Sequence, residues 1–271
     1  MSERLKRRLA AVRAQGKTGL SLFVTAGFPT PDATLPILQA LANSGVDFVE
    51  LGIPFSDPMA DGPIIQEASQ IALRNGVTLN GILETVRTFR RTSEMPVLLM
   101  GYANPVYRTG LETFLRRAAD AGVDGLILPD LPLEELRPFI SPAQKLGVDF
   151  VHLVAPNTPM ARIHQIDSAS TAFVYCVSYT GVTGQSRPLA PEITQFFTVL
   201  RRELTHPLFI GFGIRSYRDV QRLSAFCDGV IVGSAFIREL QRQRNRDWQE
   251  VAAEFVQTLR GEAARQIAGN P

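Results

Sequence analysis

The chain has 271 residues, of which 45% are hydrophobic and 20% are charged, and its formal net charge is +2. This composition supplies a sizeable core and excludes a disordered chain, and the small net charge argues against binding to nucleic acid or to an anionic membrane. The length suits one large α/β domain, because a barrel of eight strand–helix units needs ~250 residues. The sequence contains no run of ~18 apolar residues and no secretory signal at residues 1–8, so we expect neither a membrane span nor export.

Eight short apolar runs follow one another along the chain, most of them roughly 20–35 residues apart, as in βαβ units. They are rich in Val, Ile, Leu and Phe and show little polar alternation, which is typical of parallel strands covered on both faces. The runs span residues 20–25, 48–51, 97–101, 125–128, 150–154, 172–177, 208–211 and 229–232. Amphipathic stretches between them, such as 32–43 and 111–121, predict helices.

Three further segments account for the remaining length. Residues 3–14 predict an extra helix that closes the bottom of a barrel, and an insertion over 54–76 carries a helix at 64–74. A helix over 80–91 then crosses back to the third run, while Pro138 and Pro142 predict a broken or late-starting helix after the fourth run. We therefore predict a single domain over residues 1–271. Its fold class is α/β, a (β/α)8 TIM barrel with an extra N-terminal helix and an insertion after strand 2. The alternative is an open doubly wound sheet, and eight parallel-type runs without an obvious edge strand favour the barrel.

Function in such a barrel belongs at the carboxyl ends of the strands. Glu50 is embedded in the second apolar run, where burial raises the pKa of a carboxyl group and suits it to proton transfer near neutral pH. A structural ion pair with an arginine is the alternative. In the loop that follows, Asp57 is typical of a turn former, whereas Asp61 lies over the same barrel mouth as Glu50.

Glycine-rich loops follow the last three runs, at residues 181–184, 211–216 and 233–235. Glycines let backbone N–H groups approach an anion closely, and the last two loops are where barrels commonly hold a phosphate. Apolar side chains at or near the strand ends could together receive a flat aromatic group, although each alone is more often core. They are Phe23, Met100, Ile127, Tyr175 and Phe212.

Residues that are missing from the strand ends narrow the chemistry. None of the three lysines lies there, which argues against a Schiff base, and the three histidines do not pair with carboxylates at metal-ligand spacing, so no metal site is expected. The two cysteines, Cys176 and Cys227, suit buried free thiols in a reducing cytoplasm. Metal-free acid–base catalysis by carboxylates on a phosphorylated substrate remains.

The run ELGIPFSDPMADGP at residues 50–63 closely resembles the signature segment of the tryptophan synthase alpha subunit family. The resemblance extends over essentially the whole chain, through FVTAGFP at 23–29, MGYANP at 100–105, LPDLP at 128–132, GVTG at 181–184, GFGI at 211–214 and GSA at 233–235. It implies a lyase that splits indole-3-glycerol phosphate into indole and glyceraldehyde 3-phosphate for tryptophan biosynthesis.

The resemblance also implies roles for residues. Glu50 would be the general acid and base, and Asp61 would engage the indole N–H. Thr183, with Gly184, would belong to a lid over the substrate. The phosphate would be held by Gly184, Gly213, Gly233 and Ser234, with Phe212 near the indole.

The resemblance further implies an α2β2 complex without a cofactor on this chain, in which the beta subunit carries pyridoxal phosphate and receives the indole. Three alternatives stay open at the level of sequence. They are another phosphate-binding barrel such as a sugar-phosphate isomerase, a stand-alone lyase that releases free indole, and a non-catalytic activator of a beta subunit.

Overall fold

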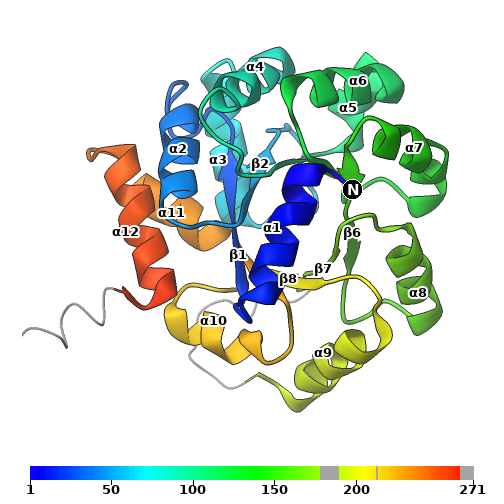
Figure 1. Ribbon diagram of the computed structural model, residues 1–271. Helices are drawn as coiled ribbons and strands as arrows, with labels where there is room; N and C mark the ends of the chain where they lie inside the picture. The colour runs from blue at the N-terminus through cyan, green and yellow to red at the C-terminus, as the bar shows by residue number, and fades with distance from the viewer. Residues whose placement is uncertain (178–188, 212, 263–271) are drawn as a thin grey trace, which may run out of the picture.

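A computed structural model describes residues 1–177, 189–211 and 213–262. The described residues form a sheet of nine parallel strands in the spatial order β5-β4-β3-β2-β1-β9-β8-β7-β6, shown in Figure 1. The strands are β1 (Gly19–Thr25), β2 (Phe48–Gly52), β3 (Val97–Met100), β4 (Gly125–Ile127), β5 (Asp149–Phe150), β6 (His152–Val154), β7 (Val174–Val177), β8 (Leu208–Gly211) and β9 (Gly229–Val232).

The fifth predicted run is where the structure differs from the sequence-based prediction. Residues 150–154 were expected as one strand, but β5 pairs only with β4 and β6 pairs only with β7. The change of partner falls at Val151, whose N–H still donates to the Leu126 carbonyl at 3.0 Å. β5 and β6 are therefore two halves of one strand. The continuous backbone at Val151 joins the two edges of the sheet and closes the eight-stranded barrel.

Helices surround this sheet and cover its outer face (Figure 1). The predicted helices at 3–14 and 111–121 are confirmed, and those at 32–43, 64–74 and 80–91 agree within two residues at each end. The described helices are α1 (Glu3–Ala14), α2 (Thr34–Asn43), α3 (Pro63–Arg74), α4 (Leu79–Phe89), α5 (Ala103–Thr109), α6 (Leu111–Ala121), α7 (Leu133–Lys145), α8 (Met160–Ala169), α9 (Pro191–Glu203), α10 (Tyr217–Ser224), α11 (Ser234–Arg242) and α12 (Trp248–Arg260). The (β/α)8 barrel is confirmed, with its extra N-terminal helix and its insertion after β2.

The expected break in the helix after β4 is wrong, because α7 runs through both prolines. Each proline lacks the N–H that would bond to the carbonyl four residues earlier, so the carbonyls of Glu134 and Pro138 lose a helical partner. Glu134, Pro138 and Pro142 are all exposed on one face of the helix. Water can satisfy the two carbonyls there, while buried Leu133, Leu136 and Ala143 hold the opposite face against the barrel.

The two faces of the sheet carry different clusters of side chains, as the alternation along a strand requires. Val49 and Leu51 point outward and pack under the helices. Phe48, which lies on the same face of β2 as Glu50, points inward. The inner cluster is aromatic at its base, with ring centroids of Phe48, Phe173 and Phe209 4.7–5.2 Å apart. Its members are Leu5, Phe48, Leu98, Ile127, Val151, Ala172, Phe173, Tyr175, Phe209 and Ile231.

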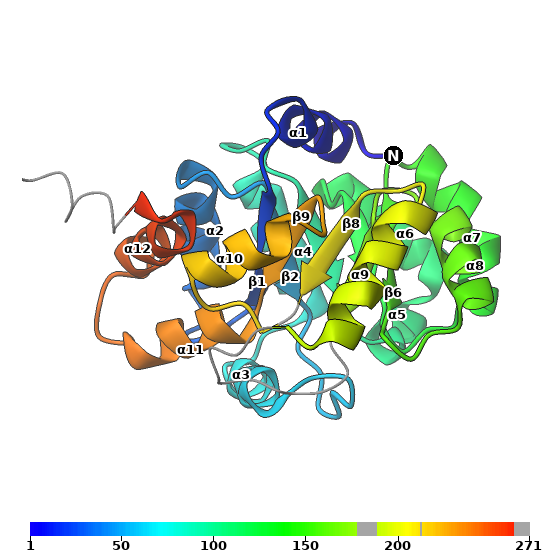
Figure 2. The same cartoon turned by 90° about the horizontal axis from the view of Figure 1, so that it is seen from below.

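Helix α1 closes the amino-terminal end of the barrel, as predicted for residues 3–14. Leu5 is fully buried within the inner cluster, and Arg4 Nε contacts Asp124 Oδ1 at 2.9 Å. Asp124 also accepts from the backbone N–H of Val97 at 2.9 Å and from Arg90 at 2.6 Å. Figure 2 shows α1 at this end and α3 at the opposite end. The carboxyl ends of the strands, under α3, are therefore the side left for a site.

The inserted helix α3 is held against the C-terminal part of the chain. Gln241 of α11 donates to Glu67 of α3 at 2.9 Å, so the insertion packs beside the helix that follows β9. Among the helices in the described part of the chain, none has the length and apolar character needed to cross a membrane.

Candidate active site

Glu50 lies in the middle of β2 with its side chain on the inner face of the barrel. Its register partners are Phe23 on β1 and Leu98 on β3, and its side chain is fully buried. Within the described residues, neither carboxylate oxygen has a hydrogen-bond partner. The alternative of a structural ion pair with an arginine therefore finds no support in the described part of the chain.

Burial without a partner determines the acid–base behaviour of Glu50. Removal from water disfavours the charged carboxylate and raises the pKa of Glu50 to about 8. A carboxyl group with such a pKa is mostly protonated at neutral pH, yet its pKa is close enough to the working pH for it to release the proton again. Unpartnered buried carboxyl groups are costly and are retained mainly where they perform chemistry.

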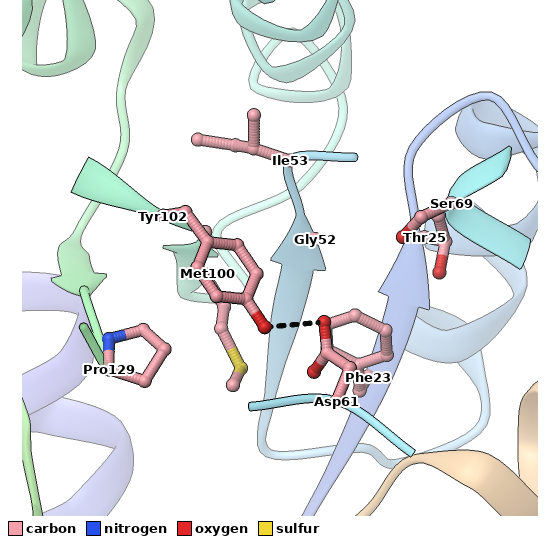
Figure 3. Close-up of a pocket in the computed structure, with 10 residues that line it drawn as sticks. Phe23, Thr25, Gly52, Ile53, Asp61, Ser69, Met100, Tyr102 and Pro129 are labelled. Carbon is pink, nitrogen blue, oxygen red and sulfur yellow. Dashed lines mark hydrogen bonds between the residues drawn. The ribbon is translucent and has the colours of Figure 1, made fainter. Parts of the chain in front are cut away.

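Asp61 approaches the barrel mouth from the loop after β2. The Tyr102 hydroxyl donates to Asp61 Oδ2 at 3.1 Å, the contact drawn as a dashed line in Figure 3. Burial raises the pKa of Asp61, and the hydrogen bond from Tyr102 opposes this rise. Asp57 in the same loop is exposed, accepts from the Ser56 hydroxyl at 2.6 Å and occupies a turn, as its sequence context predicts.

The two carboxyl groups belong to one region of the barrel. Burial raises the pKa of Tyr175 well above its ordinary value, and the negative charges of Glu50 and Asp61 raise it further. Tyr175 on β7 belongs to the inner cluster that also contains Phe48, which lies on the same face of β2 as Glu50. Its phenol remains protonated across the physiological pH range.

A small pocket opens between the ends of β1, β2 and β3 and the inserted helix α3 (Figure 3), and its lining residue Gly52 lies on the same face of β2 as Glu50. Phe23 and Met100 form two of its apolar walls, and Asp61 with Tyr102 supplies the polar side. Its lining residues are Phe23, Thr25, Gly52, Ile53, Asp61, Ser69, Met100, Gly101, Tyr102 and Pro129.

Four of the five residues predicted to receive an aromatic group face the barrel interior. Phe23 and Met100 line the pocket directly. Ile127 is the register partner of Met100, and it belongs with Tyr175 to the inner cluster against which Met100 packs. The fifth residue, Phe212, lies outside the described residues.

Two glycines let these rings lie close to the strands. A Cβ on Gly52 would lie 2.4 Å from the Phe23 ring, and one on Gly211 would lie 2.5 Å from the Tyr175 hydroxyl. Real side chains do not approach so closely, so any larger residue at either position would displace the ring. The position of Phe23 in the pocket wall and that of Tyr175 in the inner cluster therefore depend on the absence of side chains at the ends of β2 and β8.

Three of the four predicted phosphate residues, Gly213, Gly233 and Ser234, follow the neighbouring parallel strands β8 and β9. Gly213 lies two residues after β8 with a φ of +58°, a conformation that favours glycine, and Gly233 is the single residue between β9 and α11. Ser234 is the first residue of that helix, where backbone N–H groups point away from the helix without intrahelical partners. Gly184 and the expected lid residue Thr183 lie outside the described residues.

The pocket includes residues that the sequence analysis did not single out as site residues. Thr25 is almost fully buried at the end of β1, and its hydroxyl has no hydrogen-bond partner in the described part of the chain. Ser69 comes from the buried face of α3, and Pro129 follows β4. Thr25 and Pro129 stand inside the quoted motifs, so their place in those motifs was a usable signal. Ser69 carried none.

Metal ligation has no candidate among the described residues, since no group of three or more His, Cys, Asp or Glu side chains lies close enough together to hold an ion. His152 begins β6, and its neighbours Val151 and Leu153 are the residues that face inward. The imidazole therefore points outward, away from Glu50 and the pocket.

Comparison with known proteins adds a further finding to this geometry. A sequence profile described as Tryptophan synthase alpha chain matches residues 9–266. This chain belongs to the tryptophan synthase alpha chain family. The tryptophan synthase alpha chain of Thioalkalivibrio sulfidiphilus (strain HL-EbGR7) is 43% identical over 260 residues, which cover 95% of this chain and 98% of the relative. That of Chlorobium limicola (strain DSM 245 / NBRC 103803 / 6330) is 42% identical, covering 93% and 98%.

Solved structures of tryptophan synthase alpha subunits share the fold. The subunit from Legionella pneumophila str. Paris has a TM-score of 0.88 at 36% identity, covering 96% of this chain and 97% of that chain. A chain of a tryptophan synthase complex from Pyrococcus furiosus has a TM-score of 0.83 at 37% identity, covering 90% and 98%. The resemblance stated from the motifs is thus confirmed, and with it the assignment to a lyase of tryptophan biosynthesis.

Proposed function

We propose that this tryptophan synthase alpha chain cleaves indole-3-glycerol phosphate to indole and glyceraldehyde 3-phosphate, using Glu50 and Asp61. The observation that carries the proposal is the fully buried carboxyl group of Glu50, which has no hydrogen-bond partner among the described residues and lies on the same face of β2 as Gly52, a residue that lines the pocket together with Asp61. Apolar walls at Phe23 and Met100 suit the flat indole ring. The closely spaced glycines beyond β8 and β9 suit the phosphate.

The reaction breaks the bond between indole C3 and the hydroxyl-bearing side-chain carbon in a retro-aldol step. Indole C3 is a poor leaving group until it gains a proton, which converts the ring to a cationic indolenine. The hydroxyl of the side chain must then lose its proton as the carbon–carbon bond breaks and the aldehyde forms. One acid, one base and one group that stabilises the ring cation are therefore sufficient.

Glu50 serves as both acid and base in this scheme. With a pKa of about 8 it carries a proton at neutral pH and can deliver it to C3. The resulting carboxylate is buried and has no hydrogen-bond partner among the described residues, so it can act as the base for the side-chain hydroxyl. Each proton transfer of this kind typically contributes ~10²–10⁴-fold to a rate.

Asp61 stabilises the positive charge that protonation places on the ring. Its carboxylate accepts the indole N–H, and partial burial strengthens this charge-assisted hydrogen bond relative to one in water. The phosphate would rest on the backbone N–H groups of Gly213, Gly233 and Ser234, together with Gly184. Thr183 would belong to the loop that covers the substrate.

The chain requires no cofactor of its own for this chemistry. We further propose that it acts in the cytoplasm, within an α2β2 complex whose beta subunit carries pyridoxal phosphate and consumes the indole. A solved relative is itself described as part of a tryptophan synthase complex, and Cys176 and Cys227 are buried free thiols that suit a reducing compartment. Co-elution with a tryptophan synthase beta subunit on size-exclusion chromatography tests the partnership.

The direct test of the activity is incubation of the full chain with indole-3-glycerol phosphate, with and without a beta subunit, while indole release is followed. We expect indole in both cases. Release with no binding to the beta subunit would indicate a stand-alone lyase. Activation of the beta subunit without any indole release would contradict the proposal and indicate a non-catalytic activator.

A further inference from the structure

The Tyr102 hydroxyl lies between two consecutive residues of the loop after β2. It accepts a hydrogen bond from the Ala60 N–H at 3.0 Å and lies 3.1 Å from Asp61 Oδ2. A phenol has one hydrogen to donate and can accept through its lone pairs. Because Ala60 offers only a donor, the phenol hydrogen is directed to Asp61, whose oxygen acts as the acceptor.

The ring of Tyr102 is itself firmly held. It is 6% exposed and stacks on Phe55 with ring centroids 5.4 Å apart and an interplanar angle of 28°. The next residue, Ala103, donates its N–H to both carboxylate oxygens of Asp130, at 2.9 and 3.1 Å. The hydroxyl is therefore presented from a fixed point at the end of β3.

The loop that carries Asp61 depends on such contacts. Met59 within it is 94% exposed, and Asp57 is also in solvent. Besides Tyr102, Gln66 holds this part of the loop, because its amide donates to the Asp61 carbonyl at 2.9 Å and to the Pro58 carbonyl at 3.4 Å. Gln66 fixes the backbone, whereas Tyr102 contacts the carboxylate itself.

From these contacts we infer that Tyr102 is a positioning residue that aims the Asp61 carboxylate into the pocket and keeps it ionised to receive the indole N–H. The inference rests on the proposed lyase function. Burial raises the pKa of Asp61, and the hydrogen bond from Tyr102 is the contact that lowers it. Burial and the neighbouring Asp61 charge raise the pKa of Tyr102, so its hydroxyl stays a donor throughout the working pH range.

The kinetic test is Tyr102→Phe, which removes the hydroxyl and keeps the ring on Phe55. We expect kcat/KM for indole release to fall about 10–100-fold, the range for a hydrogen bond to a charged group, mainly through kcat. The acid limb of the pH–rate profile should move to higher pH, because protonated Asp61 cannot accept the N–H. Tyr107→Phe is the matched control, since the Tyr107 hydroxyl contacts exposed Glu135 outside the pocket.

Asp61→Asn separates an effect through Asp61 from an independent one. In that background, adding Tyr102→Phe should cause no further loss. A further tenfold loss, or a Tyr102→Phe enzyme with wild-type kcat/KM and an unmoved acid limb, would overturn the inference. Melting temperatures of both tyrosine variants show whether each remains folded.

A titration that needs no activity keeps this inference distinct from the lyase proposal. In protein with ¹³C-labelled aspartate carboxyls, the Asp61 resonance is identified by its loss in Asp61→Asn. Its pKa should be higher in Tyr102→Phe than in the wild type, and an equal pKa would overturn the inference. Absence of indole release from the wild-type chain would instead contradict the lyase proposal and leave this titration interpretable.

Discussion

Two buried ionisable side chains on the barrel wall illustrate how one physical cause acts in opposite directions. Glu50 faces the barrel interior and His152 faces the helices, and both lie away from water. Burial disfavours the charged form of each, so the pKa of Glu50 rises to about 8 and that of His152 falls to about 4. Glu50 lies on the same face of β2 as the pocket residue Gly52, whereas His152 points away from the pocket, so the shift of Glu50 is the one available to catalysis.

His152 makes the stability of the fold sensitive to acid. Its pKa is about 4 in the folded chain and 6.5 ordinarily, so the unfolded chain takes up the proton first as the pH falls. The contribution of neutral His152 to the free energy of unfolding is therefore fully present above pH 6.5 and is lost progressively down to about pH 4. We expect His152→Gln to reduce the fall in unfolding free energy over this range, measured by urea denaturation.

Gln165→Asn is the control for this measurement, because Gln165 is exposed on α8 and has no titratable group. Its dependence of stability on pH should follow that of the wild type. If His152→Gln also follows the wild-type curve between pH 6.5 and 4, the buried imidazole is not the source of acid sensitivity.

At the residue scale, sequence identifies a chemical group more readily than its partner. Glu50 was recognisable because a charge inside an apolar run demands an explanation. The contact of the Tyr102 hydroxyl with Asp61, by contrast, spans 41 positions and depends on how the loop after β2 folds. No local pattern encodes such a contact.

Among the elements, α11 is the one whose start bears most directly on substrate binding. It begins at Ser234, and Gly233 alone separates it from the end of β9. A Cβ on Gly233 would contact Phe23 at 3.6 Å and Ile65 at 3.7 Å, so this helix start lies beside a wall of the pocket. Its unpaired N–H groups and its dipole favour an anion at this position.

Ser234→Asp places a negative charge where we propose that the phosphate binds. We expect KM for indole-3-glycerol phosphate to rise at least tenfold, with a smaller change in kcat, because the charge opposes binding more than chemistry. Ser168→Asp on the exposed surface of α8 is the matched control. If the KM of Ser234→Asp equals that of Ser168→Asp, the start of α11 does not bind the phosphate.

At the element scale, the pattern of apolar runs was sufficient to predict the strands, because parallel strands covered on both faces are apolar throughout. It could not predict the division at Val151, since Phe150, Val151 and Leu153 are apolar whichever neighbour each half pairs with. The continuity of α7 through Pro138 was also hidden. It depends on which face of the helix meets water.

The whole molecule separates stability from chemistry along the barrel axis. Carboxylates at the amino-terminal end are saturated with donors, as at Asp47, which accepts from the Leu20 N–H at 2.8 Å and pairs with Arg260 at 3.2 Å. At the opposite end, Glu50 has no partner among the described residues. We propose that residues 1–271 form one domain, supported by the contacts of α1 and α12 with the same barrel.

The activity of Glu50→Gln tests the central claim most directly. Glutamine keeps the size of the side chain but cannot exchange the proton. We therefore predict that kcat for indole release falls by a factor of ~10²–10⁴ or more. The dissociation constant of the Glu50→Gln chain for indole-3-glycerol phosphate should lie within a few-fold of the wild-type KM. Glu84→Gln on the exposed face of α4 is the matched control and should keep wild-type activity. A Glu50→Gln chain that releases indole at a near wild-type kcat would contradict the account.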